Sequence, residues 1–136
     1  MAAKIICDTD VMIDYWDATK PRHSNTKAIL ETEITLDRIV LSAITKMELM
    51  TGALNKSDLN KISKLLHRFD ILLLNNDITT KAFSLIQEHH LSHGLAIPDC
   101  LIAATTLVSD LELFTYNTKD FKFIKGLRLF VSTRIS

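Results

Sequence analysis

The stretch "KIICDTDVMID", residues 4–14, decides the fold expected for this chain. An apolar run with β-branched residues is followed at once by three acids, Asp8, Asp10 and Asp14. Residues 4–7 predict a strand that is buried on both faces, and "DTDVMIDYW" predicts a helix that begins with capping residues. The acids are therefore expected at a junction between a strand and a helix.

The alternation of strand and helix continues along the chain. Further strands are predicted at residues 38–42, 70–75, 111–116 and 127–131, and helices at 24–33, 43–54, 57–69, 77–94 and 97–110. Ser24 and Ser42 are the expected caps of the first two of these helices. Strands separated by helices, without a tight hairpin signal, predict an α/β fold with a central, mostly parallel sheet of about five strands, covered on both sides. In such sheets a ligand site lies at the carboxyl ends of the strands.

Length, charge and cysteine content narrow the class of protein. The 136 residues fit one domain, 1–136. Sixteen basic residues balance sixteen acidic ones, so a polyanion such as RNA would have to be bound by a local patch. Two cysteines are too few for a disulfide framework or a cysteine-based zinc site. No apolar run approaches membrane-spanning length, and a cytoplasmic location is expected.

Acids recur at the predicted carboxyl edge of the sheet. Asp8 follows the first strand, Glu48 lies in the helix after the second, Asp99 in the first turn of a later helix, and Asp120 after the fourth strand. Gathered carboxylates raise one another's pKa unless a cation neutralises them, and hard oxygen ligands select Mg²⁺ or Mn²⁺. Each acid also has a structural interpretation: Glu48 as an exposed or ion-paired helix acid, and Asp99 as a complement to the helix dipole.

Four segments carry a resemblance to a known family. They are "ICDTDVMID", "SAITKMELMTGA", "IPDCLIAATTL" and "LFTYNTKDFKFIKGLRLF", in this order along nearly the whole chain. With them the sequence resembles the PIN-domain ribonuclease family, a three-layer α/β/α fold, and within it the VapC-type toxins of toxin–antitoxin pairs. The resemblance implies metal-assisted hydrolysis of RNA phosphodiesters, with Asp8, Glu48 and Asp99 as ligands of Mg²⁺ or Mn²⁺.

The fourth position of the acidic site is open. Many PIN domains have an acid where this chain offers Asn117, with Asp120 three residues later. Asn117 is retained as a catalytic candidate because an amide can orient a water molecule or a substrate phosphate. The resemblance also implies a homodimer, and a small antitoxin protein that covers the acidic cleft.

Residues around the motifs supply further candidates. Thr9 could hydrogen-bond an acid or a metal-bound water, or merely cap the helix. Asp10 and Asp14 are interpreted as a cap and a surface residue. Lys46 and Lys119 belong to a set of basic residues near the motifs that could contact RNA phosphates or could simply be solvated.

Other side chains have two interpretations each. His89 and His93 have the four-residue spacing of metal-binding histidines, but without a further ligand nearby they are read as part of a helix face. Trp16 and its apolar neighbours could form a partner interface or belong to the core.

Two other functions compete with the nuclease. One is a catalytically weak PIN-like module that only binds an antitoxin or an operator complex, which Asn117 in place of an acid would suit. The other is a haloacid-dehalogenase-like phosphatase, whose first Asp would be a nucleophile in "CDTDV". The three glycines in the chain make the Gly-rich motif of that class hard to place.

Overall fold

A computed structural model describes residues 3–134, and a parallel sheet forms its centre. Every strand pairing in these residues is parallel, and the five strands lie in the order β3-β2-β1-β4-β5. The strands are β1 (Ile5–Cys7), β2 (Ile39–Ser42), β3 (Asp70–Leu72), β4 (Glu112–Phe114) and β5 (Arg128–Leu129). The predicted α/β class and the five-stranded sheet are confirmed.

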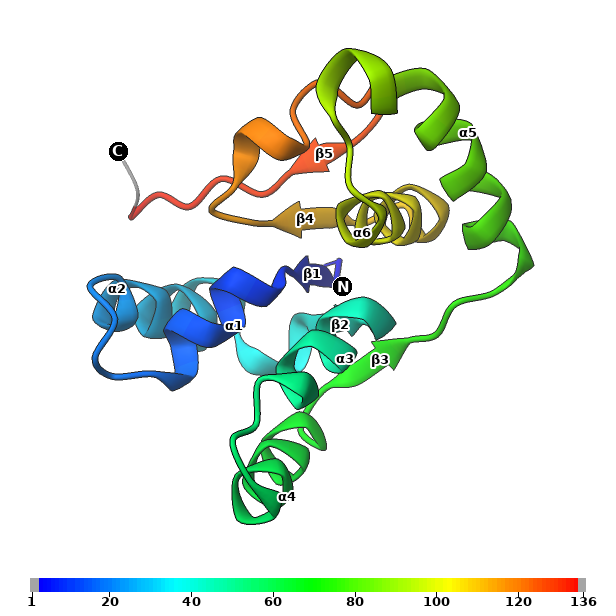
Figure 1. Cartoon of the computed structure of the whole chain (residues 1–136). Coiled ribbons are helices and arrows are strands. Elements are labelled where there is room, and N and C mark those ends of the chain that lie inside the picture. The colour runs from blue at the N-terminus through cyan, green and yellow to red at the C-terminus, as the bar shows by residue number, and fades with distance from the viewer. Residues whose placement is uncertain (1–2, 135–136) are drawn as a thin grey trace.

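Six α-helices and three shorter helical segments connect the strands within the described part of the chain (Figure 1). The α-helices are α1 (Thr9–Trp16), α2 (His23–Ala28), α3 (Ala43–Thr51), α4 (Lys56–Leu66), α5 (Asn76–His93) and α6 (Ile97–Ser109). The shorter segments are the π-helical η1 (Ile29–Ile34) and the 3₁₀ turns η2 (Leu36–Arg38) and η3 (Thr118–Asp120). None of the helices in residues 3–134 is long and apolar enough to cross a membrane.

The strands build two cores because their side chains alternate between the faces of the sheet. Ile5 and Cys7 of β1 pack in a cluster with residues of α1, η1, α3 and α4, whereas Ile6 packs with residues of α5 and α6. The sheet is thus the middle of three layers, with α1 and α2 on one side and α5 and α6 on the other (Figure 1). Burial on both faces explains why β1 and β2 read as continuous apolar runs.

One predicted helix start is wrong. Helix α2 begins at His23, with Arg22 as its N-cap and no capping hydrogen bond from a side chain, so Ser24 lies inside the first turn. The His23 ring explains the earlier start, because its Nδ1 lies 2.9 Å from the Asp14 carbonyl oxygen and ties this end of α2 to α1. The Ser42 cap is confirmed, since the Ser42 hydroxyl accepts a hydrogen bond from Thr45 N.

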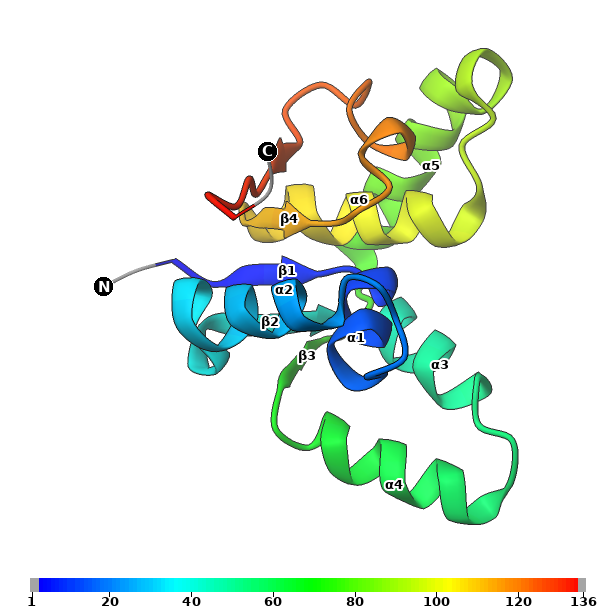
Figure 2. The same cartoon turned by 90° about the vertical axis from the view of Figure 1, so that its left-hand side faces the viewer.

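The strand order places a topological switch point between β1 and β4. From β1 the chain proceeds outward through β2 to β3, and it returns on the other side of β1 as β4 and then β5 (Figures 1 and 2). At the carboxyl ends of the two central strands, Asp8 N donates a hydrogen bond to the Phe114 carbonyl over 2.9 Å. Ligand sites in open α/β sheets lie at such switch points.

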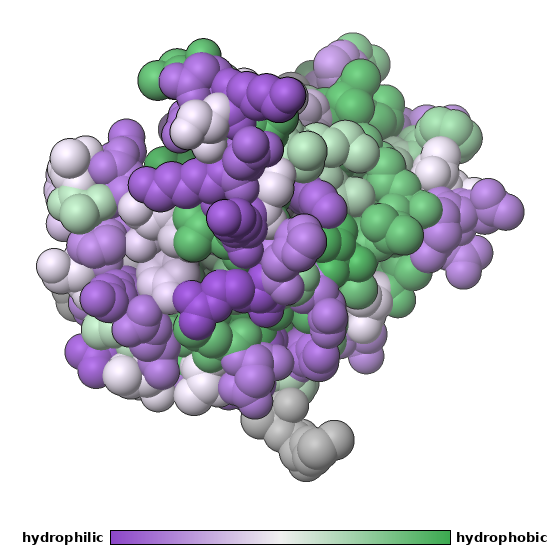
Figure 3. Space-filling model, turned by 90° about the horizontal axis from the view of Figure 1, so that it is seen from below, coloured by the Kyte–Doolittle hydropathy of each residue, from purple (hydrophilic) through white to green (hydrophobic). Residues whose placement is uncertain are grey.

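The surface seen from below is mainly hydrophilic, and hydrophobic side chains gather toward the side on which β3 and α5 lie (Figure 3). The exposed apolar residues of the chain include Leu73 and Leu74, which directly follow β3. These two side chains line a recess of about 380 Å³ together with residues of α6. The carboxyl edge of the sheet is instead bordered by acids.

Candidate active site

Asp8 is the central acid of the carboxyl edge. It caps α1 and is only 5% exposed. Its Oδ1 accepts a hydrogen bond from Thr9 N over 2.7 Å, and its Oδ2 accepts one from the Thr115 hydroxyl over 2.8 Å. Burial raises the pKa of Asp8 against the effect of these two hydrogen bonds, and the negative charges of Glu48 and Asp120 raise it further.

Glu48 is joined to this acid through Thr9. The Thr9 hydroxyl donates a hydrogen bond to Glu48 Oε1 over 2.7 Å, and its oxygen lies 3.0 Å from the Thr45 hydroxyl oxygen. A hydroxyl has one proton and a carboxylate only accepts, so the Thr9 proton goes to Glu48 and the Thr9 oxygen can accept from Thr45. The Ser42 hydroxyl extends this chain, 3.2 Å from Thr45. Thr9 therefore orients Glu48 and also belongs to the α1 cap.

Asp99 enters the edge from the opposite layer, in the first turn of α6. It is half-buried, and burial is the main reason that its pKa is raised to about 6. The charges of Asp8, Asp120 and Glu48 contribute in that order. Acids from four separate segments therefore act on one another across this edge of the sheet.

No basic side chain compensates these charges within residues 3–134. The ion pairs found there join Lys4 to Asp70, Arg22 to Asp14 and Arg128 to Asp110, and the His89 ring lies 3.5 Å from Glu88. Asp8, Glu48, Asp99 and Asp120 take part in none of them. Uncompensated carboxylates in a partly desolvated cleft fit a hard divalent cation, whose charge would relieve their repulsion.

The four acids do not converge on one point. Among the residues that the structure describes, no three His, Cys, Asp or Glu side chains are close enough to form a metal centre. Glu48 is exposed, and the Thr9 hydroxyl is its side-chain hydrogen-bond partner within the described residues. The carboxylate oxygens are of the type that binds Mg²⁺ or Mn²⁺. To bind one ion together, these side chains would have to move closer to one another.

Asp120 acts electrostatically on two of the other acids, whereas Asn117 is uncharged. Asp120 raises the pKa of both Asp8 and Asp99, and it lines a small recess together with Asp99. Asn117 is exposed and precedes η3, where its backbone N–H donates to the Thr115 hydroxyl over 3.1 Å. The backbone N–H of Asn117 thus contacts Thr115, the residue whose hydroxyl donates a hydrogen bond to Asp8.

The two predicted phosphate contacts differ in position. Lys119 lies in η3 and borders the recess of Asp99 and Asp120. Lys46 lies two residues before Glu48 in α3, and residues two apart on a helix point to nearly opposite sides. Within residues 3–134, Lys46 makes no ion pair with an acid of the cluster.

Asp10 and Asp14 have structural roles that the sequence did not reveal. Asp10 bridges α1 to the segment after β4, because its carboxylate accepts from Val11 N over 2.8 Å and from Tyr116 N over 3.0 Å. Burial, and then the charge of Asp8, raises the pKa of Asp10 to about 6. Asp14 is not the predicted surface residue.

The Asp14 carboxylate is buried and pairs with Arg22 Nε over 2.6 Å. The Arg22 guanidinium in turn lies 3.9 Å above the Tyr116 ring, a cation–π contact. The pair of buried Asp14 and exposed Arg22 thus ties α1 to the start of α2 and to the segment that carries Asn117. An acid in an amphipathic helix gives no hint that such a partner will be present.

Thr45 and Thr115 were not singled out from the sequence, although both support the acids. Thr45 is fully buried three residues before Glu48, and Thr115 is 4% exposed directly after β4. The sequence offered one signal for each of them, namely a threonine among apolar residues close to a motif. Its partner could not be inferred, because Thr115 contacts an acid that lies 107 residues earlier in the chain.

The sequence matches the PIN-domain family over residues 5–127, and the chain belongs to that family. Membership excludes the phosphatase alternative and confirms the resemblance expected from the four motifs. A curated relative, Ribonuclease VapC1 of Methanocaldococcus jannaschii, is 26% identical over 132 residues, which cover 94% of this chain and 88% of that protein.

Solved structures of toxin–antitoxin complexes contain chains with this fold. A chain of a toxin–antitoxin complex from Klebsiella pneumoniae is 30% identical, with a TM-score of 0.71, and the match covers 93% of this chain and 95% of that one. A chain of VapBC2 from Rickettsia felis, solved bound to a promoter DNA fragment, is 25% identical with a TM-score of 0.72, over 93% and 96%. The chain is therefore similar to members of toxin–antitoxin complexes over nearly its full length.

Proposed function

We propose that this protein is an endoribonuclease that depends on Mg²⁺ or Mn²⁺, acts as a VapC-like toxin, and is neutralised by a cognate antitoxin. The observation that carries the proposal is the group of uncompensated acids at the switch point of a PIN-domain sheet. Asp8, Glu48 and Asp99 are the proposed metal ligands, and Asp120 adds negative charge beside them. A cytoplasmic location and a single PIN domain over residues 1–136 go with this proposal.

The chemistry follows from the residue types. A divalent ion supplies the positive charge that activates a water molecule for attack and offsets charge on the phosphate and the leaving oxygen. The Thr9 hydroxyl holds Glu48 toward the cleft, and Thr115 holds Asp8. Asn117, exposed after Thr115, is the residue proposed to orient a water molecule or a phosphate oxygen, and Lys46 and Lys119 are the proposed phosphate contacts. Direct attack by water would leave a 5′-phosphate and a 3′-hydroxyl.

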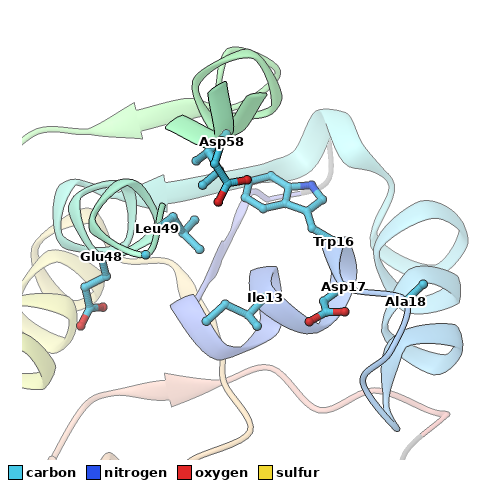
Figure 4. A pocket seen from close by; sticks show the side chains of 9 residues that line it. Ile13, Trp16, Asp17, Ala18, Glu48, Leu49 and Asp58 are labelled. Atoms are coloured by element: carbon cyan, nitrogen blue, oxygen red, sulfur yellow. The ribbon is translucent and has the colours of Figure 1, made fainter. Parts of the chain in front are cut away.

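An antitoxin is supported by the solved complexes and by a pocket beside the acids. The pocket, of about 450 Å³, lies between α1, α3 and α4, and Ile13, Trp16 and Glu48 are among its lining residues (Figure 4). Trp16 is thus half-buried at a pocket wall, whereas its neighbours Met12 and Tyr15 are core. We propose that an amphipathic antitoxin segment fills this pocket with its apolar face and meets Glu48 and Asp17 with basic side chains. A homodimer is proposed on the family resemblance alone.

A catalytically weak binding module is the second candidate. It is favoured by the lack, within residues 3–134, of three acids close enough for a ready metal centre. Titration of the purified protein with Mn²⁺ separates the two candidates, because a module that only binds an antitoxin has no need of the ion.

The deciding experiment uses the protein freed of any antitoxin. Cellular RNA is incubated with wild-type protein in Mg²⁺, with EDTA, and with the Asp8→Asn variant, and the cut ends are mapped. Asp77→Asn, which changes an exposed acid in the first turn of α5, is the matched control. Cleavage with 5′-phosphate ends in the wild type and the control, lost in EDTA and in Asp8→Asn, supports the nuclease. Absence of both cleavage and Mn²⁺ binding would favour the binding module.

A further inference from the structure

A recess of about 90 Å³ borders the acidic cluster on the side of α6. Two acids of the cluster, Asp99 and Asp120, form part of its wall. The remaining wall is made of two rings, a lysine and three residues of the turn after α5: His93, Phe123, Lys119, Gly94, Leu95 and Ala96. Figure 2 shows the elements involved, with the orange η3 segment beside the yellow-green turn that joins α5 to α6.

The rings in this wall are stacked. His93 lies parallel to Phe123, with ring centroids 4.1 Å apart and an interplanar angle of 8°. His89 packs against the same Phe123 ring at 5.0 Å, so the pair rests on a third ring. Phe123 and His89 are partly buried, whereas His93 is exposed. Phe123 therefore covers one face of the His93 ring. Because His93 is exposed, its side chain remains accessible to a ligand in solution.

Local structure fixes this ring relative to the acids. Helix α5 ends at Gly94, whose positive φ of 66° reverses the chain directly after His93, and Asp99 follows six positions after His93. Leu95 in the reversal is 3% exposed, and its carbonyl oxygen lies 3.2 Å from His90 Nδ1. The His93 Nδ1 lies 2.8 Å from the Ser92 hydroxyl. The ring and Asp99 are therefore held at the two ends of one short, anchored turn.

These residues do not suit a metal site. His93 Nδ1 already has a partner in Ser92, whereas His89 Nε2 is buried without a hydrogen-bond partner in the described residues, 3.5 Å from Glu88 Oε2. No group of three ligating side chains forms at this place within residues 3–134. An exposed ring on an aromatic support, beside an exposed lysine, instead matches the elements that bind single-stranded nucleic acid. Bases stack on such rings and phosphates contact basic groups.

We propose that His93, supported by Phe123, forms with Lys119 a subsite for one unpaired nucleotide next to the phosphate that is cleaved. The subsite rests on the proposed ribonuclease function and names the residues that would position the nucleotide beside the cut. A base that stacks on a protein ring has left its duplex, so the substrate is single-stranded RNA or a loop. Because every base has a stacking face, the subsite selects unpaired over paired RNA more strongly than one base over another.

Two measurements test the subsite separately from catalysis. Binding is measured in EDTA, where no metal-dependent cleavage occurs, with short random-sequence oligoribonucleotides, either single-stranded or as a duplex. Cleavage is then measured in Mg²⁺ as kcat/KM on an oligoribonucleotide that contains a mapped cut site. The variants are His93→Ala, His93→Phe and Lys119→Ala.

Matched controls come from the same elements. Leu91→Ala changes a residue of α5 that is 98% exposed, and Lys122→Ala changes an exposed lysine near Lys119. The Tm of every variant is recorded, so that a loss of fold is recognised. His93→Phe keeps a flat ring and separates stacking from any other role of the histidine.

Loss of the ring in His93→Ala is expected to weaken single-strand binding and kcat/KM by about tenfold or more, as for other stacked bases. His93→Phe should restore both, and Lys119→Ala should lower the salt dependence of binding by about one phosphate contact. Duplex binding should be unchanged in His93→Ala and His93→Phe, because paired bases do not stack on the ring.

Equal binding and cleavage by His93→Ala and Leu91→Ala would overturn the subsite and leave the nuclease intact. If His93→Ala loses binding but the wild type cleaves no RNA in Mg²⁺, the nuclease proposal fails and only RNA binding at this place survives. A loss in His93→Ala that His93→Phe does not restore would overturn stacking as the reason.

Discussion

The Thr9 hydroxyl donates a 2.7 Å hydrogen bond to Glu48 Oε1, although the two residues are 39 positions apart in the sequence. This contact joins the cap of α1 to the middle of α3 and gives the exposed Glu48 side chain a defined direction. Thr45, 3.0 Å from Thr9, supports the same hydroxyl from the buried side. The orientation of one proposed metal ligand thus depends on two threonines that bind no metal themselves.

Removal of the Thr45 hydroxyl is expected to weaken metal binding through Glu48. Thr45→Val keeps the shape of the side chain and leaves Thr9 without its buried partner. The hydrogen bond that is lost joins two uncharged hydroxyls and contributes about 0.5–1.5 kcal/mol, so we expect kcat/KM to fall by roughly two- to tenfold. Thr80→Val, on the exposed surface of α5, is the control. The Mn²⁺ Kd and kcat/KM of both variants are to be compared, and equal values would contradict a role for the hydroxyl chain.

Neutralising Asp99 should raise stability while it abolishes activity. The pKa of Asp99 is raised to about 6 by burial and by Asp8, Asp120 and Glu48, so its ionised form destabilises the folded protein without a cation. In EDTA at neutral pH, Asp99→Asn is expected to have a higher Tm than the wild type, with cleavage reduced by at least about a hundredfold. Thermal unfolding and RNA cleavage are the two readouts. A lower Tm for Asp99→Asn, with Asp77→Asn unchanged, would show that Asp99 supports the fold.

Stability without metal should decrease as the pH rises through about 6. Burial and the charge of Asp8 raise the pKa of Asp10 to about 6, and Asp99 is raised to a similar value. In the unfolded chain an aspartate has a pKa of about 3.9, so the folded state holds these protons over the interval between the two values. Their contribution to the free energy of unfolding is complete below about pH 4 and is lost as the pH rises through about 6.

Metal should counter this loss, because it binds the ionised carboxylates. The Tm in EDTA is therefore expected to fall between about pH 5 and pH 7, and Mn²⁺ should raise the Tm more at the higher pH. Scanning calorimetry over this range checks the sign. An increment from Mn²⁺ that is equal at both pH values would argue against ionisation of these acids as its cause.

Asp120 and Asn117 should differ in which step they affect. Asp120 raises the pKa of Asp8 and of Asp99, so its charge lies close to the proposed ligands. Asp120→Asn is expected to weaken Mn²⁺ binding by about tenfold, the scale of one lost neighbour of a metal site. Asn117→Ala should leave the Mn²⁺ Kd unchanged and lower kcat. Titration calorimetry and single-turnover cleavage separate the two, and the reverse pattern would assign the fourth ligand to Asn117.

The sequence by itself determined the sheet, the order of its elements and the acids that border it. The apolar run of β1 can be recognised because this strand is buried on both faces, and Asp8 directly follows it. Asp99 stands in the first turn of its helix, where an acid is a common start signal. Capping signals are local as well, as Ser42 shows. Such features depend on near neighbours in the chain, and a pattern of near neighbours is sufficient to predict them.

Only the tertiary structure decided which side chains meet. Thr115 holds Asp8 across 107 positions, Asp14 is buried against Arg22 although its pattern indicated the surface, and His93 stacks on Phe123 beside Asp99. These contacts depend on how β4 pairs with β1 and how α5 turns into α6, which no single segment encodes. The physical reason is that carboxylates and rings take their roles from burial and partners, and both are supplied by distant parts of the fold.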